Sequence, residues 1–273
     1  MWRSTLVVAL VLPLAALSAA DTGLLFHAPF DGALEAYSLG GAGTPVTVDG
    51  PAPAFVPGRF GQALVAGAEQ TLVHYATAGN VFPRSGTVSL WINPQNWSPD
   101  DNNFHSFFES GSIDGNNGWL ILYKYYQNSW LLLRYADEEQ QVGMASYQCP
   151  AWPEGEWRHL AATWAENALR LYVDGEMVAQ AANPLVAGTL ADTFRVGDNG
   201  WHVPHEGART LVDEVRVYGY PLSPEQIRNL AGNLKVTVVR DPRASVWNVS
   251  CRLPDGIAVG SVAVSLHPAD GGE

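Results

Sequence analysis

EWRHLAATWAENALRLYVDGEMVAQ, residues 156–180, is the stretch that decides the fold. Within it, residues 169–173 (LRLYV) place apolar side chains at every second position, which is the period of a β-strand with one apolar face. Asp174-Gly175 then predicts a two-residue hairpin turn, because both turn positions need a positive φ and glycine adopts it at no steric cost. The stretch therefore contains at least one β-hairpin.

The same stretch also predicts how its strands pair and which way they face. A two-residue turn places Leu171 opposite Val178, which would fix the register of the hairpin. In the segment before it, Leu160, Ala162 and Trp164 alternate with smaller or polar residues and share one face. Three consecutive strands of this kind predict an antiparallel meander.

Short strand-like segments and turn residues follow one another along most of the remaining chain. Strands are expected at about 24–30, 61–65, 71–76, 87–93, 104–109, 119–125, 130–135, 194–196 and 211–218. One face of the first is expected to carry Leu24, Phe26, Ala28 and Phe30. Residues 223–226, SPEQ, form a capping box with proline at the first helical position, so a short helix should end before Gly232. Many short strands with one terminal helix predict an all-β sandwich.

The first 20 residues have the organisation of a secretory signal peptide. A short segment with the positive Arg3 precedes an apolar run at 6–17, and residues 18–20 (SAA) are the small residues expected before cleavage at Asp21. The alternative is an uncleaved membrane anchor, but the run is shorter than the roughly 18 residues of a span. We therefore expect a secreted, periplasmic or cell-surface protein that is not inserted in the membrane once the signal peptide is removed.

The net charge of the mature chain excludes some classes of binding partner. The net charge is −12, and removal of residues 1–20 with Arg3 takes it to −13. A surface of this sign repels nucleic acid and anionic membranes, so we expect neither as a partner.

Export permits disulfides, and the two cysteines are Cys149 and Cys251. A bridge between them, two unpaired thiols, and a partner for Cys251 beyond residue 273 all stay open.

Four motifs resemble those of a known family. LVDEVRVYGYPLSPEQIRNL, WRHLAATW, LRLYVDGEMVA and GTVSLWINP are similar to motifs of the laminin-G-like, concanavalin A-like jelly-roll domains of secreted bacterial proteins, across about residues 24–232. The resemblance implies two curved antiparallel sheets packed face to face, with a concave outer surface. We expect a jelly-roll domain at 21–232. Residues 233–273 would be the start of a second β-domain of a longer polypeptide, or an appendage on the first.

Asp213 is the most informative acidic residue. In the strand 211–218 it alternates in phase with Leu211, Val215 and Val217, so it is expected to point towards the core and to need a hydrogen bond or a counter-charge. The resemblance implies that Asp213 and Asp31 hold a structural calcium ion, with backbone carbonyls and waters completing six to eight oxygen ligands. The alternative is that Asp213 caps backbone amides of a neighbouring loop.

Aromatic residues on the expected strands could bind a ligand. Trp91, Trp119, Tyr123 and Trp130 are expected to line the concave sheet, and Arg134 has the parity of Trp130. Aromatic rings stack on the apolar C–H faces of sugars, and a few polar groups then fix the orientation. The alternative is that these rings are ordinary packing residues of a strand-rich sandwich.

No motif of the chain establishes catalysis. Glu109 and Asp114 are the one tempting carboxylate pair, but the chain lacks the ExDxxE pattern of the family's glucanases, as well as HExxH and a nucleophile elbow. His202 and His205 have HxxH spacing, but proline and glycine around them predict an irregular loop rather than a metal-binding helix. The sequence therefore assigns no catalytic residue.

We expect a non-catalytic extracellular module that binds a glycan or an extracellular protein. It would form the N-terminal part of a larger secreted protein, whose downstream domains would be further partners. The alternative is that this segment is the accessory domain of a polysaccharide-degrading enzyme with its catalytic domain beyond residue 273, or is itself such an enzyme.

Overall fold

The computed structural model describes residues 23–111, 117–183, 187–197 and 208–232, and the backbone of 235–241 and 246–252. Residues Gly23–Gly232 form one compact unit. The signal peptide expected at 1–20 lies outside the described residues.

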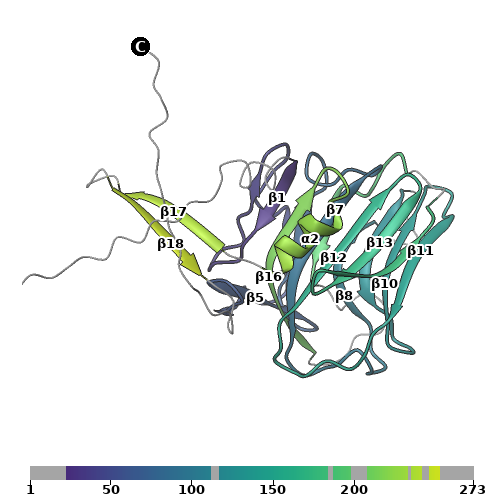
Figure 1. Ribbon diagram of the computed structural model, residues 1–273, viewed down its shortest axis with the longest axis horizontal. Helices are drawn as coiled ribbons and strands as arrows, with labels where there is room; N and C mark the ends of the chain where they lie inside the picture. The colour runs from purple at the N-terminus through teal and green to yellow at the C-terminus, as the bar shows by residue number, and fades with distance from the viewer. Residues whose placement is uncertain are drawn as a thin grey trace, which may run out of the picture. The chain divides into compact units, whose positions relative to one another are not determined.

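Two antiparallel β-sheets make up this unit (Figure 1). The first contains β1 (Leu24–Ala28), β2 (Tyr37–Ser38), β4 (Phe55–Pro57), β5 (Gln62–Gly67), β7 (Gly86–Pro94), β12 (Arg158–Ala165), β13 (Ala168–Val173), β14 (Glu176–Ala181) and β16 (Arg209–Tyr218). The second contains β3 (Thr47–Asp49), β6 (Leu72–Ala76), β8 (His105–Ser110), β9 (Trp119–Lys124), β10 (Trp130–Ala136), β11 (Val142–Gln148) and β15 (Thr193–Val196). The expected all-β jelly-roll sandwich is confirmed.

The order of the strands shows how the sheets are built. The nine-stranded sheet runs β14-β13-β12-β7-β16-β1-β2, with β5 also paired to β16 and β4 paired to β5. The seven-stranded sheet runs β11-β10-β9-β8-β15-β6-β3. The expected meander is β12-β13-β14, at one edge of the first sheet.

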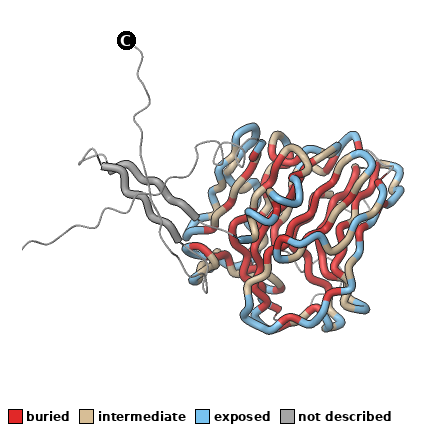
Figure 2. The backbone as a smooth tube through the Cα atoms, viewed as in Figure 1, coloured by how far each residue is buried: buried red, intermediate tan, exposed pale blue. Residues whose placement is uncertain are grey.

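Apolar side chains from both sheets form one buried core cluster. Buried residues run along the strands of both sheets (Figure 2). Phe26 of the first sheet meets Phe194 and Tyr75 of the second, with ring centroids 5.1 Å and 4.8 Å away. Trp164 is also completely buried, and its indole Nε1 donates a hydrogen bond to the carbonyl of Phe82 at 2.9 Å. Because each strand alternates its side chains, this core determines which residues face outward.

The hairpin turn forms as expected, but its register differs. Asp174 and Gly175 have φ of 51° and 86°, the positive values that a two-residue turn requires. Leu171 lies opposite Ala179, however, because a β-bulge in β14 inserts Val178 as an extra residue. The predicted Leu171–Val178 pairing is therefore wrong.

A second bulge changes the face of the first strand. Leu24 pairs with Tyr218 while Phe26 pairs with Val217, so Leu25 is the extra residue. Leu24 consequently packs on the outer side of the sheet instead of sharing the core face of Phe26. The expectation for Leu24 was wrong for this reason.

The predicted helix is α2 (Pro224–Ala231), which packs against the outer face of the nine-stranded sheet (Figure 1). Its capping box is present: Gln226 N donates to Ser223 Oγ at 3.2 Å, and Ser223 N donates to Gln226 Oε1 at 2.9 Å. Ile227 is buried in a cluster with Tyr172 and Tyr218. In the described part of the chain, no helix has the length and apolar character to cross a membrane.

After residue 232, β17 (Lys235–Asp241) and β18 (Val246–Arg252) form an antiparallel pair. They lie in the stretch expected to begin a second β-domain or an appendage, and residues 253–273 lie outside the described residues. Cys149 in the first unit is a free, buried cysteine, and burial raises the pKa of its thiol to about 12. The side chain of Cys251 lies outside the described atoms, so its pairing stays open.

An ion cluster connects the loop before β8 with β9. Lys124 Nζ donates to Asp101 Oδ1 at 2.5 Å, to the Asn103 carbonyl at 2.9 Å and to the Asp101 carbonyl. His105 Nε2 lies 3.0 Å from Asp101 Oδ2, and its ring stacks on Trp97 with centroids 3.9 Å apart. These contacts tie the loop before β8 to the end of β9.

Burial and pairing act differently on the two partners of this cluster. Burial alone would raise the pKa of Asp101, but hydrogen bonds and charge from His105 and Lys124 outweigh it and lower that pKa below 3.8. Burial dominates for Lys124 and lowers its pKa below 10.5, since its side chain is 1% exposed and that of Asp101 is 20% exposed. The same loop holds the ring of Phe104 5.1 Å from that of Tyr123.

Replacing Lys124 with methionine should lower the free energy of unfolding by about 3 kcal/mol, because a partly buried Asp101 loses its counter-charge. Adding Asp101→Asn should recover part of that loss, measured by urea unfolding at pH 7 in a double-mutant cycle.

In the wild-type protein, the contribution of Asp101 is present above its unfolded-state pKa of about 3.9. It is lost as the pH falls through the lower folded-state pKa. If Lys124→Met were as stable as the wild-type protein, the structural role of this cluster would be contradicted.

Candidate functional site

The outer side of the seven-stranded sheet carries a second apolar cluster, separate from the core. Its buried members are Phe104, Trp119, Ile121, Tyr123, Leu132 and Ala136, and Tyr125, Tyr126 and Trp130 pack against them half-buried. We call this surface the aromatic face. Three of the four predicted aromatic ligand residues, Trp119, Tyr123 and Trp130, are brought together here.

The pairing of β9 with β10 positions these side chains. Ala136 lies directly opposite Trp119, and Arg134 lies opposite Ile121. Residues directly opposite each other share a face of the sheet. The small side chain of Ala136 leaves room beside the indole, and the guanidinium of Arg134 lies 4.8 Å from the Trp119 ring centroid, within cation–π range.

Exposure divides the aromatic face into a base and a rim. Trp119 and Tyr123 are only 1% and 4% exposed and form the base. Tyr125, Tyr126 and Trp130 are half-buried, and the rings of Tyr125 and Tyr126 lie 4.3 Å apart. Burial raises the pKa of Tyr123, with a smaller opposing effect of the nearby Arg134. Rim rings on a packed base form a surface on which a flat apolar group can stack.

Glu109 lies on this face as a positioning residue. Its Oε2 pairs with Arg195 Nη2 of β15 at 2.5 Å, and its Oε1 accepts a hydrogen bond from Trp119 Nε1 at 3.1 Å. One carboxylate oxygen of Glu109 therefore holds Trp119, and the other is engaged by Arg195. Asp114, the second acid of the pair considered for catalysis, lies outside the described residues. The sequence did not reveal Arg195, because its partner is 86 residues away.

Trp91 belongs to the other sheet. Its strand β7 pairs with β12 and β16, and the ring is 5% exposed. The guanidinium of Arg59 lies 4.6 Å from its ring centroid, and the ring of Phe60 packs edge-on at 6.2 Å. The expectation that Trp91 lines the same sheet as Trp119 is wrong, because β7 forms part of the nine-stranded sheet.

Asp213 also faces outward, contrary to expectation. It lies opposite Trp91, whereas Arg216 lies opposite Ser89, so β16 contains one extra residue between them. Glu214 in this bulge has a φ of 53°, an uncommon conformation for a residue with a side chain. The bulge reverses the alternation, and this is why the predicted core orientation of Asp213 is wrong.

Asp213 and Asp31 both hold the turn between β4 and β5. Asp213 Oδ2 accepts a hydrogen bond from Phe60 N, and Asp31 Oδ1 accepts one from Gln62 N, each at 2.8 Å. A Cβ at Gly61, which has a φ of 65°, would lie 1.8 Å from Asp31 Oδ1, so only glycine fits there. Asp213 therefore caps a backbone amide, as the alternative to calcium binding predicted.

The two carboxylates could supply only part of a calcium shell. Oxygen donors suit calcium, but within the described ranges there is no group of three or more His, Cys, Asp or Glu side chains that could hold a metal ion. Backbone carbonyls and waters would have to provide the rest, and calcium stays a prediction. His202 and His205 lie outside the described residues.

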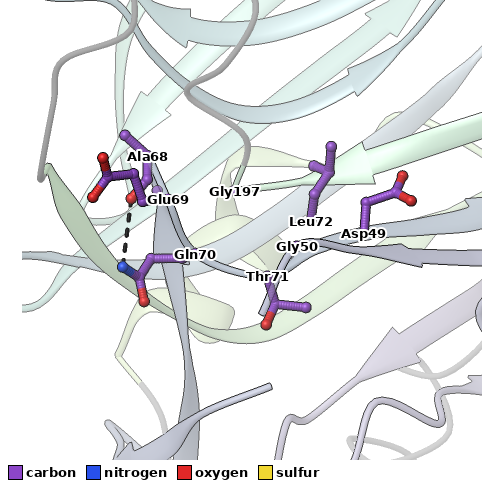
Figure 3. Close-up of a pocket in the computed structure, with 9 residues that line it drawn as sticks. Asp49, Gly50, Ala68, Glu69, Gln70, Thr71, Leu72 and Gly197 are labelled. Atoms are coloured by element: carbon purple, nitrogen blue, oxygen red, sulfur yellow. Dashed lines mark hydrogen bonds between the residues drawn. The ribbon is translucent and has the colours of Figure 1, made fainter. Parts of the chain in front are cut away.

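A pocket of about 250 Å³ lies at the turn between β5 and β6 (Figure 3). Its lining residues include Asp49, Glu69, Gln70 and Thr71 but no aromatic residue. Gln70 Nε2 donates to the Ala68 carbonyl at 3.4 Å, so part of its polar lining is used internally. The aromatic face offers a larger stacking surface and is the stronger candidate site.

Comparison with curated proteins finds similarity to two much longer proteins. The chain is 25% identical over 191 residues to the sushi, von Willebrand factor type A, EGF and pentraxin domain-containing protein 1 of Rattus norvegicus, and 24% identical to that of Mus musculus. The match covers 65% of this chain and 5% of each relative.

Several solved structures have a similar fold. Domain 4 of AbnA, an extracellular GH43 arabinanase from Geobacillus stearothermophilus solved with arabinotriose, is 25% identical with a TM-score of 0.56, over 77% of this chain and 99% of that domain. A second structure is of botulinum neurotoxin type C, a toxin whose cell entry depends on interaction with two ganglioside molecules. It is 14% identical with a TM-score of 0.63, over 79% of this chain and 52% of the toxin chain.

A match to a protein-family model shows the family to which the chain belongs. The model described as the concanavalin A-like lectin/glucanases superfamily, of laminin-G type, matches residues 67–228, more than half of the chain. This range contains the meander, the aromatic face and the start of the capped helix. The chain therefore belongs to the concanavalin A-like lectin/glucanases superfamily.

Proposed function

We propose that this domain is a non-catalytic module that binds a glycan on its aromatic face. The observation that carries the proposal is the set of half-buried rings, Tyr125, Tyr126 and Trp130, on the fixed base of Trp119 and Tyr123. Sugar rings present apolar C–H faces that stack on aromatic rings, and a rigid base lowers the entropy lost on binding. An extracellular protein is the alternative ligand.

The comparisons support a glycan ligand. The arabinanase domain is similar over nearly its whole length and was solved with arabinotriose. A botulinum neurotoxin DC binding domain, 14% identical and alike in fold, was solved with a sialylated ligand named SialylT. These ligands belong to those proteins and give the first glycans to test on this one.

The contacts of the Glu109 carboxylate favour glycan binding over glycan hydrolysis. Hydrolysis of a glycosidic bond typically uses two carboxylates in acid, base or nucleophile roles. Both oxygens of Glu109 are occupied by Arg195 and Trp119. We infer a role as an accessory domain, and the similarity to one domain of an arabinanase favours a place in a polysaccharide-degrading enzyme.

The position of this domain within a longer polypeptide is a further part of the proposal. The chain spans about 5% of the length of its curated relatives. With the signal-peptide pattern at 1–20, we propose that this domain lies at the N-terminal end of a longer secreted protein.

Replacing Trp130 with alanine should weaken glycan binding at least about tenfold, because a central aromatic contact at a binding surface commonly contributes more than 1.4 kcal/mol. The measurement is calorimetric titration with arabinotriose, sialylated oligosaccharides and any glycan retained on an array. Tyr37→Ala is the matched control, since Tyr37 is 56% exposed on β2 of the other sheet.

The thermal midpoint of Trp130→Ala should stay close to wild type, because the ring is half-buried. Equal affinities of wild type and Trp130→Ala would contradict the proposal, as would the absence of any glycan ligand.

We also propose that calcium stabilises the turn held by Asp31 and Asp213. Adding a chelator should then lower the thermal midpoint, because an ion bound to the native state alone raises stability. Asp213→Asn keeps an oxygen that can accept from Phe60 N, yet removes the charge that a calcium ion needs. The chelator should have no effect on that variant. A wild-type midpoint that does not change with chelator would argue against calcium.

A further inference from the structure

Arg134 differs from the other charged residues near the aromatic face. Its guanidinium lies over the ring of Trp119 at 4.8 Å, and no carboxylate of the described residues forms an ion pair with it. Its Nε is buried without a hydrogen-bond partner among the described residues. A guanidinium without a carboxylate partner gains a charge-assisted hydrogen bond from a ligand that supplies one.

The neighbouring charges are already compensated. Glu109 pairs with Arg195, and Lys124 pairs with Asp101. In the described structure, Arg134 thus gives the aromatic face an uncompensated positive charge, on a chain whose net charge is −12. A positive charge retained on an otherwise acidic protein, beside rings suited to stacking, indicates an acidic ligand group.

We propose that the aromatic face recognises sugars that carry a carboxylate, namely uronic or sialic acids, and that Arg134 binds the carboxylate. This inference rests on the proposed glycan-binding function and specifies its ligand class. The planar guanidinium matches a carboxylate with two parallel hydrogen bonds, and its stacking on Trp119 fixes it beforehand. A neutral sugar covering Arg134 would bury the charge without a partner, which selects against it.

The sheet around Arg134 does not cover its side chain completely. Arg134 is half-buried, and Met144 of β11 lies directly opposite it and is 46% exposed. Arg134 also forms a side-chain hydrogen bond with Tyr123, and its charge opposes the rise in the pKa of both Tyr123 and Tyr125, so it lies among the rings of the aromatic face. A sugar stacked on the rim can therefore present its carboxylate to Arg134.

The test compares each acidic ligand with its neutral methyl ester. The probes are oligogalacturonate, oligoglucuronate and sialyllactose, titrated calorimetrically into the domain. At least one acid should bind about tenfold to a hundredfold more tightly than its ester, the range expected for a hydrogen bond to a charged group. Uronic and sialic acids are distinguished by which of the probes binds.

Arg134→Gln should remove this preference, so that the acid and its ester bind with similar affinity. Arg170→Gln is the matched control with the same change in charge, because Arg170 lies on β13 of the other sheet, where its Nε bonds to Gln180. It should keep the preference.

Met144→Glu gives a second test that does not alter Arg134. The new carboxylate would lie opposite Arg134 and compete for it, so acid binding should fall about tenfold, whereas Met144→Gln should bind as wild type. Because Met144 is exposed, both variants should fold normally.

If esters bind as tightly as acids, or if Arg134→Gln keeps the preference, this inference is overturned, although binding that depends on Trp130 would still support the proposed function. If no glycan binds, both fail.

Discussion

The burial of one face of each sheet against the other is the interaction on which the rest of the structure depends. Phe26, Tyr75 and Phe194 interlock across the two layers and are completely buried. Because side chains alternate along a strand, the residues used for this core determine which positions remain outside. On β9 and β10 those positions carry Trp119, Tyr123, Trp130 and Arg134. The aromatic face is therefore a direct consequence of the way the core is filled.

Local departures from alternation give the outer surfaces their polar groups. The bulge at Glu214 turns Asp213 outward, where it caps the turn that covers Trp91 with Arg59 and Phe60. On the other sheet, Glu109 holds the indole of Trp119 through a hydrogen bond and is itself held by Arg195. One sheet thus has a covered tryptophan and the other has a supported set of rings with a half-buried rim. This difference is why we propose that a ligand binds to the seven-stranded sheet.

The sequence predicted the sandwich, the hairpin turn and the capped helix because each depends on neighbouring residues. It failed where one extra residue enters a strand, since a bulge at Val178, Leu25 or Glu214 leaves no clear mark in composition. β11 was also missed. For the candidate site, the sequence proposed Trp119, Tyr123 and Trp130 by their residue type, and the structure places these three on one face. It could not exclude Trp91 or find the partners Arg195 and Asp101, because burial and ion pairing depend on contacts between distant segments.

The most direct test of the aromatic face as the binding site is NMR of the tryptophan indole N–H signals during titration with a glycan that the protein retains. The account predicts that the Trp130 signal shifts with ligand concentration. The signals of Trp164 and Trp97, whose indoles are hydrogen-bonded to Phe82 and Thr210 inside the sandwich, should stay in place. A Trp130 signal that is unchanged at saturation, while signals on the other sheet move, would contradict it.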